Sequence, residues 1–405
     1  MIHLALLSLL ALGGPAFADD TDLDSSETVT GSPPLSPVSA PKVGEAPPPQ
    51  DWSVAIKAGA AALKMDVEFV GQCWTGTQLI FKRRYKEGKK YFDEFDKRYP
   101  GLGVGHTGAV LIYQSMMMEN FDFKWEQPYK AHSDMAIKDL EDSLRKSDKN
   151  AAWKQFIIGS LEGIESIHLM RKTEYVSALA RGVDAMGHID ESRKLAPDFV
   201  DPLLGDGLYK YWRTVVTMNS KVLPKGSDQR AEGIAEMQRV ERDGVFLAPG
   251  ATLALAFTYI EERDLKTAQI YCLRNYKLYP DNVVNNMVLA RVYMYQRRYD
   301  DSLKMLREIL ADAPDNERAH YYFATVYLRQ RKFAEAEASI DRYLAFKLEP
   351  YYKAQALHRK GDIYYYRKDY AKAEQYYRQA VDVDDYGPSQ VRLDHIADLR
   401  KAGKL

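Results

Sequence analysis

The chain has 405 residues, which is enough for two or three domains or for one long array of repeats. Its 56 lysines and arginines nearly balance its 57 aspartates and glutamates, so the formal net charge is -1. A protein without a global basic field is not drawn onto a phosphate backbone, which disfavours nucleic-acid binding as the main role.

Residues 1–18 have the features of a signal peptide. The apolar run IHLALLSLLAL is followed by a Gly-Gly-Pro break and by the small-x-small sequence AFA, which predicts cleavage before Asp19. An uncleaved membrane anchor is the alternative, but the run is shorter than the roughly 20 residues that span a bilayer. No cysteine follows the run, so lipid attachment is not expected. The mature protein is therefore predicted to be periplasmic or secreted, without a transmembrane segment.

Residues 19–50 combine proline, serine, threonine and acidic side chains with almost no large apolar ones. Such a segment cannot bury enough apolar surface to offset the entropy of ordering it. We therefore expect a disordered, partly polyproline linker that holds a folded domain away from its attachment point, which fits a cell-envelope protein.

The sequence contains two cysteines, Cys73 and Cys272, and an exported protein meets an oxidising compartment. One disulfide is possible on that ground. The favoured interpretation is that the thiols are free, because Cys272 falls on an apolar helical position, where a thiol behaves as a small hydrophobic side chain.

From residue 51 onward apolar residues recur at intervals of three and four, and no segment alternates with the period of a strand. Residues 51–248 are therefore predicted to be a degenerate array of helix pairs. The expected pairs span 73–99, 107–147 and 153–195, and a fourth joins 201–213 to 228–240.

The C-terminal part of the chain repeats itself at intervals of 34, 34 and then 37 residues. A small residue recurs in one column, at Ala256, Ala290, Ala324 and Gly361, and a tyrosine follows each of them after three residues. The register continues through Leu265, Tyr299, Phe333 and Tyr370, and then through Ala268, Ser302, Ala336 and Ala373. The small residues are expected to let two helices approach closely, while the aromatic residues fill the space at the turn.

This register resembles the tetratricopeptide repeat, a 34-residue helix-turn-helix unit. The resemblance covers residues 249–387 and implies four repeats in an all-α fold, a right-handed α-solenoid of helix hairpins. Residues 388–405 are then expected to form a C-terminal capping helix. The sequence departs from the family at the usual tryptophan position of the first helix, which is held by Thr252, Asn286, His320 and Leu357. Together with the signal peptide, the resemblance indicates an exported bacterial member of the superfamily.

In such a solenoid the first helix of each repeat lines a concave groove, and its side chains outside the repeat framework are available to a partner. The candidate contact residues are Met287, Arg291, Met294, Tyr295, Arg318, Tyr321, Thr325, Arg329, His358, Asp362 and Tyr365. Arginine, tyrosine and methionine are enriched at the centres of protein interfaces. The expected partner is an extended or helical peptide from another envelope protein.

No constellation in the sequence supports a specific chemistry. Residues 103–108 match the dinucleotide-binding pattern GxGxxG, but they follow a helical segment rather than a strand, which indicates an inter-helix loop. The eight histidines form neither HExxH nor a Cys/His quartet, and His188 is expected with acidic neighbours on a solvated face. The three methionines at 116–118 are expected to pack in the core. We therefore predict no metal, no cofactor and no catalytic residue.

The leading interpretation is a scaffold or adaptor that mediates protein–protein interactions in the assembly or organisation of a cell-envelope complex. The alternative is a helical enzyme domain over residues 51–248, acting on cell wall or lipid, with the repeats as a targeting arm. An enzyme would show a deep pocket with convergent ionisable groups of shifted pKa, whereas a scaffold would show a continuous groove. Self-association through the ends or convex faces of the repeat stack is a third possibility.

Overall fold

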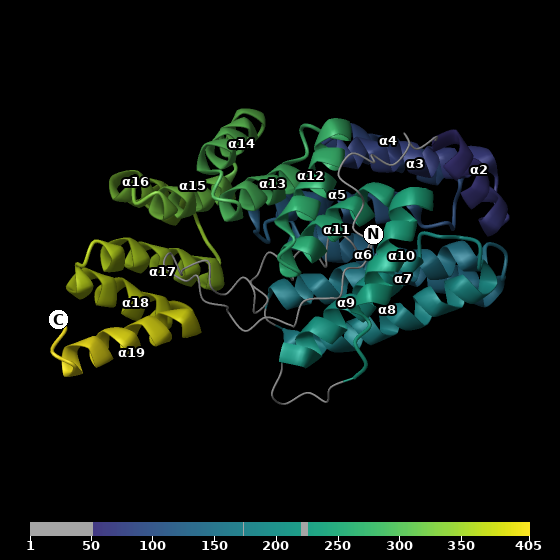
Figure 1. Ribbon diagram of the computed structural model, residues 1–405. Helices are drawn as coiled ribbons and strands as arrows, with labels where there is room; N and C mark the ends of the chain where they lie inside the picture. Colours follow the sequence, from purple (N-terminus) through teal and green to yellow (C-terminus); the bar gives the residue numbers. More distant parts are fainter. Residues whose placement is uncertain (1–51, 173, 220–225) are drawn as a thin grey trace. The chain divides into compact units, whose positions relative to one another are not determined.

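The structure is a computed structural model that describes residues 52–172, 174–219 and 226–405. The predicted signal peptide and linker lie outside these residues. Every regular element in the described part of the chain is an α-helix, and no strand occurs there (Figure 1). The predicted all-α fold class is therefore confirmed.

The chain folds as two compact units. Over the described residues, unit 1 comprises 52–118 and Phe123–Val288, and unit 2 comprises Glu119–Asp122 and Leu289–Leu405. The helices wholly within unit 1 are α2 (Trp52–Leu63), α3 (Val67–Phe81), α4 (Tyr85–Arg98), α6 (Glu126–Lys146), α7 (Ala151–Arg171), α8 (Tyr175–Leu195), α9 (Leu203–Asn219), α10 (Arg230–Asp243), α11 (Ala248–Glu261) and α12 (Leu265–Leu278). Unit 2 holds α14 (Tyr299–Asp312), α15 (Glu317–Arg329), α16 (Phe333–Leu344), α17 (Pro350–Tyr366), α18 (Tyr370–Asp384) and α19 (Gly387–Lys401). The division falls within α5 (Val104–Asn120) and within α13 (Val283–Tyr295). The domain boundaries predicted from the sequence stay predictions.

Consecutive helices of unit 1 pack against one another in chain order, most extensively in the pairs α7/α8 and α9/α10. These two pairs are the hairpins predicted from the sequence over 153–195 and 201–240. Where α9 and α10 cross, two glycines meet, because a Cβ on Gly233 would lie 2.4 Å from the carbonyl oxygen of Gly207. The close approach of the two backbones therefore requires glycine at this crossing.

A buried carboxylate fixes the start of α11. Asp201 accepts hydrogen bonds from three backbone N–H groups, those of Val245 (2.9 Å), Phe246 (2.8 Å) and Leu247 (2.8 Å). The first N–H groups of a helix and of the turn before it lack intrahelical partners, and a carboxylate that accepts several of them is strongly bound. Asp201 thus ties the residues before α9 to the residues before α11.

The predicted columns of small residues lie between the helices of unit 2. Ala290, Ala324 and Ala336 are buried, and the Ser302 hydroxyl donates a 2.7 Å hydrogen bond to the carbonyl oxygen of Ala290. A Cβ on Gly361 would lie 2.5 Å from the ring of Tyr377. Side chains larger than these would hold the two helices of a repeat apart, so the columns set the helix spacing as predicted.

The turn inside each repeat is closed by a residue in the left-handed region. These residues are Arg263 (φ 60°), Arg297 (φ 60°), Arg331 (φ 59°) and Lys368 (φ 64°). Their spacing is the same 34, 34 and 37 residues as that of the sequence columns, so the backbone geometry repeats with the sequence. Helix hairpins that recur in this way and pack in chain order make the predicted α-solenoid.

The GxGxxG segment was expected to be an inter-helix loop, but only Gly103 lies in the turn after α4, and residues 104–108 already belong to α5. The segment follows a helix and not a strand, as expected. The burial predicted for the methionines and the free state favoured for the thiols are confirmed. Met117 and Met118 are buried, and so are Cys73 and Cys272, whose thiols are free. Over the residues that the structure describes, every helix is too short or too polar to cross a lipid bilayer.

Candidate functional site

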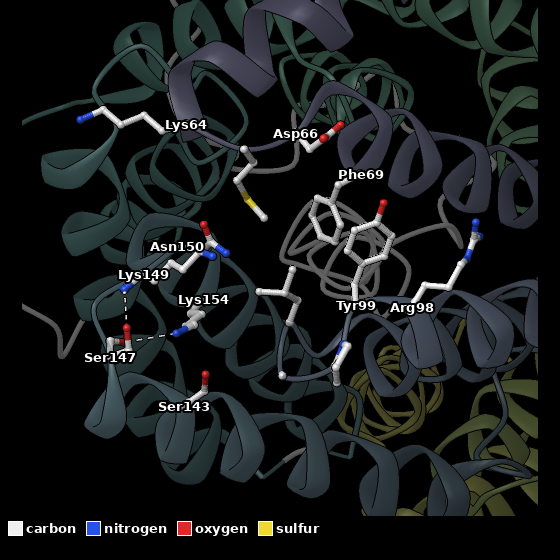
Figure 2. Close-up of a pocket in the computed structure, with 14 residues that line it drawn as sticks. Lys64, Asp66, Phe69, Arg98, Tyr99, Ser143, Ser147, Lys149, Asn150 and Lys154 are labelled. Carbon is white, nitrogen blue, oxygen red and sulfur yellow. Dashed lines mark hydrogen bonds between the residues drawn. The ribbon is translucent and has the colours of Figure 1, made fainter.

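A cavity of about 520 Å³ lies in unit 1 among the ends of α4 and α6 and the starts of α3 and α7 (Figure 2). Its wall contains the four cations Lys64, Arg98, Lys149 and Lys154 and the single acid Asp66. On composition alone such a recess would suit an anion with an apolar part. The directions of the side chains decide whether it can hold one.

The four cations do not converge on one point. Figure 2 shows Lys64 and Arg98 extending toward opposite sides, with the rings of Phe69 and Tyr99 between them in this view. Lys154 is buried, and its ammonium donates a 3.2 Å hydrogen bond to the carbonyl oxygen of Ser147. Burial lowers the pKa of Lys154. The cavity is thus an amphiphilic recess and not a clamp for a single anion.

A second cavity, of about 490 Å³, lies between α7 and α8 in unit 1. Gln155 and Glu162 of α7 line it, together with Asp184, His188 and Glu191 of α8. The spacing of four and three residues places the three α8 side chains on one face of that helix. Three carboxylates line the cavity, and no lysine or arginine does so within the described part of the chain.

Glu162 is the buried acid of this cavity, with a side chain that is 6% exposed. Its Oε1 accepts a 3.3 Å hydrogen bond from Arg181, which also pairs with Glu165 at 2.9 Å. Its Oε2 accepts no hydrogen bond. Burial, opposed by Arg181, raises the pKa of Glu162 to about 7.

His188 faces Glu162 across the cavity. Its Nδ1 lies 2.5 Å from Oε1 of Gln155, and because an amide oxygen can only accept, Nδ1 carries the hydrogen and Nε2 is an acceptor. Burial lowers the pKa of His188, which keeps the ring neutral near pH 7. Nε2 lies 3.7 Å from Glu162 Oε2, so two acceptors face each other when the Glu162 carboxyl is ionised. His188 was expected on a solvated face, but it is partly buried at this cavity.

The predicted groove residues lie on α13, α15 and α17, as the repeat register requires. Three of them are partly exposed: Tyr295, Arg329 and Tyr365. Eight are buried: Met287, Arg291, Met294, Arg318, Tyr321, Thr325, His358 and Asp362. These eight do not line an open surface, which corrects the prediction. The predicted residues of α15 are buried because this helix packs against α14, α16 and α17, which cover most of its circumference.

Two of the partly exposed residues are brought together by the stacking of repeats. The guanidinium carbon of Arg329 on α15 lies 5.8 Å from the centre of the Tyr295 ring on α13. Tyr365 on α17 has a similar neighbour in Arg392, at 5.0 Å. An arginine over a tyrosine ring is a cation–π pair that presents planar donors beside an aromatic face. This combination is suited to a protein partner.

Arg318 is the centre of an aromatic cluster in unit 2. It is 1% exposed, and its guanidinium carbon lies 4.2 to 5.9 Å from the centres of five rings, those of Phe121, Tyr321, Tyr322, Tyr343 and Tyr352. Its Nη1 donates a 3.1 Å hydrogen bond to the Tyr343 hydroxyl. No carboxylate pairs with it among the residues that the structure describes, and its Nε has no acceptor. Ring faces therefore supply the stabilisation that an acid would otherwise provide.

Asp362 joins α17 to α18 and α19. Its Oδ1 accepts a 2.8 Å hydrogen bond from the Tyr377 hydroxyl and lies 3.7 Å from Nε of Arg392. Its Oδ2 lies 3.3 Å from Nη1 of Arg359 and 3.6 Å from Nε2 of His358. A buried carboxylate needs several such partners to offset its desolvation. Asp362 and His358, predicted as partner contacts, instead hold three helices together.

A short segment of the chain already lies against the first helices of the repeats in unit 2. Asn316 Nδ2, at the start of α15, donates a 2.9 Å hydrogen bond to the carbonyl oxygen of Glu119. The ring of Phe121 contacts Arg318 and lies edge-on to Tyr352 of α17, with 6.3 Å between the ring centres. These helices thus hold residues 119–122 through one backbone carbonyl and one aromatic side chain.

Sequence reasoning missed three residues of these sites: Phe121, Arg359 and Glu162. Phe121 contacts a helix nearly two hundred positions away along the chain, and no local pattern reports such a contact. Arg359 is a charged residue on a helix that is mostly covered by its neighbours. The repeat register alone does not reveal that this side chain is buried. Glu162 had a usable signal, because it is an acid in the otherwise apolar stretch FIIGSLEGI of α7.

Two stretches of this chain match family models that are described as the tetratricopeptide repeat. One match covers residues 287–352, and the other covers residues 354–385. No curated protein matches the chain.

Solved structures of low identity are similar to the chain. A tetratricopeptide repeat protein from Parabacteroides merdae ATCC 43184 is 14% identical, with a TM-score of 0.42 over 67% of this chain and 93% of that chain. Yeast Tom70 is 12% identical, with a TM-score of 0.42 over 78% and 76%. The human IFIT1 dimer with PPP-AAAA is 14% identical, with a TM-score of 0.40 over 80% and 86%. From the two family-model matches, residues 287–385 of this chain carry tetratricopeptide repeats.

Proposed function

We propose that this protein is an exported scaffold whose repeats bind a segment of another cell-envelope protein. The observation that carries the proposal is the partly exposed pair of Tyr295 and Arg329, which successive repeats bring together on their first helices. Tetratricopeptide repeats are units that stack into binding surfaces for other proteins. An aromatic ring beside a guanidinium is the chemistry of an interface anchor.

The segment 119–122 supports the same proposal. The first helices of the repeats bind this segment by donating to a backbone carbonyl and by enclosing an aromatic side chain. A partner peptide with an aromatic residue beside an acid would meet similar groups at the pair of Tyr295 and Arg329. We therefore expect the partner segment to carry a tyrosine or phenylalanine next to a carboxylate.

The proposed envelope location is supported by the signal peptide and the proline-rich linker expected over residues 1–50. Fractionation of the native cell, followed by N-terminal sequencing of the mature protein, tests it. We expect the protein outside the cytoplasm with Asp19 as its first residue. A cytoplasmic protein that retains residues 1–18 would remove export from the proposal and leave the scaffold role to be judged separately.

The binding role is tested by crosslinking in the native cell and by pull-down with purified variants. We expect Arg329→Glu, and separately Tyr295→Ala, to reduce recovery of the crosslinked partner at least tenfold, since each removes one half of the anchor pair. The matched control is Arg307→Glu, which makes the same charge change at an exposed position of α14. Equal recovery by all three variants, with unchanged circular dichroism, would contradict the proposal.

The enzyme alternative has one observation in its favour, which is the cavity that holds Glu162 and His188. A buried carboxyl with a pKa of about 7 beside a neutral imidazole is an arrangement found in general acid–base sites. Helical scaffolds also contain such pairs, and no nucleophile or oxyanion site accompanies this one among the described lining residues. We therefore interpret the cavity as a binding site.

A further inference from the structure

The cavity between α7 and α8 concerns unit 1, so what it binds goes beyond the role proposed for the repeats. Its two innermost acceptors, Glu162 Oε2 and His188 Nε2, are 3.7 Å apart. Neither has a hydrogen-bond donor among the described residues, because Arg181 bonds the other oxygen of Glu162 and Gln155 bonds the other nitrogen of His188. A group that donates to both atoms would satisfy them at once.

The charge of the cavity specifies the sign of that group. Glu162, Asp184 and Glu191 line it, and Lys194, an exposed side chain outside the lining, pairs with Glu191 at 3.3 Å. Arg181 is shared between Glu162 and Glu165, so it balances one of two carboxylates. The field in the cavity is therefore negative and favours a cation.

The arrangement of ligands specifies the kind of cation. No group of three or more metal-ligating side chains converges in the described residues, so a bare metal ion is not favoured. A nitrogen of an ammonium group can lie about 2.9 Å from both acceptors and donate a hydrogen to each. The cavity volume of about 490 Å³ leaves room for the alkyl chain behind it.

We infer that this cavity binds a primary ammonium group on an alkyl chain, with Glu162 Oε2 and His188 Nε2 as acceptors and Asp184 as a second negative charge at the mouth. Two sources supply this chemistry: the lysine side chain of a protein and a free alkyl diamine. Gly187 also lines the cavity, and a Cβ there would meet no atom within 4 Å, so the position has room for a side chain.

The test is calorimetric titration of the full-length protein, about one pH unit above the pKa of Glu162 so that its carboxyl is ionised. Three probes are compared: N-acetyl-lysine methylamide, cadaverine and N-acetyl-norleucine methylamide. We expect the two cationic probes to bind and the norleucine compound, which lacks the ammonium, not to bind. A tighter complex with the lysine compound would identify a protein side chain as the source, and a tighter complex with cadaverine a free amine. No binding of either cationic probe up to about 10 mM, or equal binding of the norleucine compound, would overturn the inference.

Variants assign the binding to the named atoms. Glu162→Gln keeps the shape and removes the charge, so we expect the dissociation constant to rise about tenfold or more. Asp184→Asn, at an exposed position, is expected to raise it about twofold to threefold. Glu94→Gln makes the same charge change at an exposed position of α4 outside the cavity and should leave it unchanged.

Gly187 gives a second, independent set of variants. Gly187→Lys should abolish binding, since it adds a long cationic side chain at a lining position, whereas Gly187→Ala should bind as the unmodified protein does. If Glu162→Gln and Gly187→Lys both bind the lysine compound as tightly as the unmodified protein, the binding lies elsewhere and the assignment is wrong.

Discussion

The guanidinium carbon of Arg318 lies 5.0 Å from the centre of the Phe121 ring, and both side chains are buried. Phe121 is separated from α15 by almost two hundred residues of chain, yet it belongs to the same compact unit. Because Arg318 has no acid partner among the described residues, the rings around it must stabilise its charge. The packing of residues 119–122 is therefore part of the stability of unit 2.

Replacing Phe121 should destabilise the fold. We expect Phe121→Ala to lower the free energy of unfolding by about 3 kcal/mol, because it removes a buried ring and one face of the cation–π cluster. Urea unfolding followed by circular dichroism measures this. Val391→Ala, at an exposed position of α19, serves as the control and should change stability by less than about 0.5 kcal/mol. A loss as small as that in Phe121→Ala would mean that the segment does not hold unit 2.

Replacing the buried Asp362 should lower the free energy of unfolding more than replacing the buried Arg318. We expect Asp362→Asn to lower stability by about 3 kcal/mol, because it leaves two arginines and a histidine around it without their carboxylate. Arg318→Met should cost less than about 1 kcal/mol, since it removes a charge without stranding an opposite one. Asp398→Asn, an exposed aspartate of α19, is the control for the first change. Equal losses in the Asp362 and Arg318 variants would contradict this account of the two sites.

Two glycine substitutions should have opposite effects. Gly233→Ala should lower stability by about 2 kcal/mol, because the new Cβ would lie 2.4 Å from the carbonyl oxygen of Gly207 and would force α9 and α10 apart. Gly187→Ala should raise stability by about 0.5–1 kcal/mol, because the Cβ meets no atom and alanine favours the helix. Thermal unfolding of the two variants in one buffer compares them directly. A stabilised Gly233→Ala variant would show that the crossing is looser than described.

The stability of unit 1 should depend on the protonation of Glu162. The folded-state pKa of about 7 lies above the ordinary value of 4.5, so the folded protein keeps this proton over a range in which the unfolded chain has lost it. The contribution of Glu162 to stability is therefore full below about pH 4.5 and declines as the pH rises to about 7. Urea unfolding at several pH values should show that Glu162→Gln gains stability relative to the unmodified protein as the pH rises through this window. A difference that does not change with pH would contradict the raised pKa.

The two thiols should react only when the protein unfolds. Cys73 and Cys272 are buried, and burial raises the pKa of each thiol, so little reactive thiolate forms at neutral pH. We expect Ellman's reagent to label neither cysteine in the native protein within minutes and both in guanidinium. Fast labelling of the native protein, or no labelling after unfolding, would indicate exposure or a disulfide respectively.

Periodicity in the sequence was sufficient to predict the repeat framework. The column that contains Ala290, Ala324 and Gly361 must be small wherever two helices touch, and this requirement is imposed again at every repeat. The same interval recurs in the left-handed residues Arg297, Arg331 and Lys368, because the turn geometry is set by the helices on either side. Local rules of this kind act between residues close in the chain, and they are therefore readable in order along it.

The groove residues could not be predicted in the same way. The repeat register placed Arg318, Tyr321 and Asp362 on the correct helices. It does not contain the information that three other helices cover α15, or that Phe121 from a distant loop packs against it. Exposure depends on every element that packs around a side chain, and no single helix carries that information. The same holds for Glu162 and His188, whose chemistry depends on the burial that they share across α7 and α8.

The sequence by itself determined that the described chain is helical, that its C-terminal helices pair in units of about 34 residues, and which side chains keep them close. Only the tertiary structure decided which polar side chains are buried and which acceptors face one another. The physical reason is that helix pairing is governed by short-range periodicity, whereas desolvation and electrostatic pairing are set by three-dimensional distances between residues that the chain brings together only on folding.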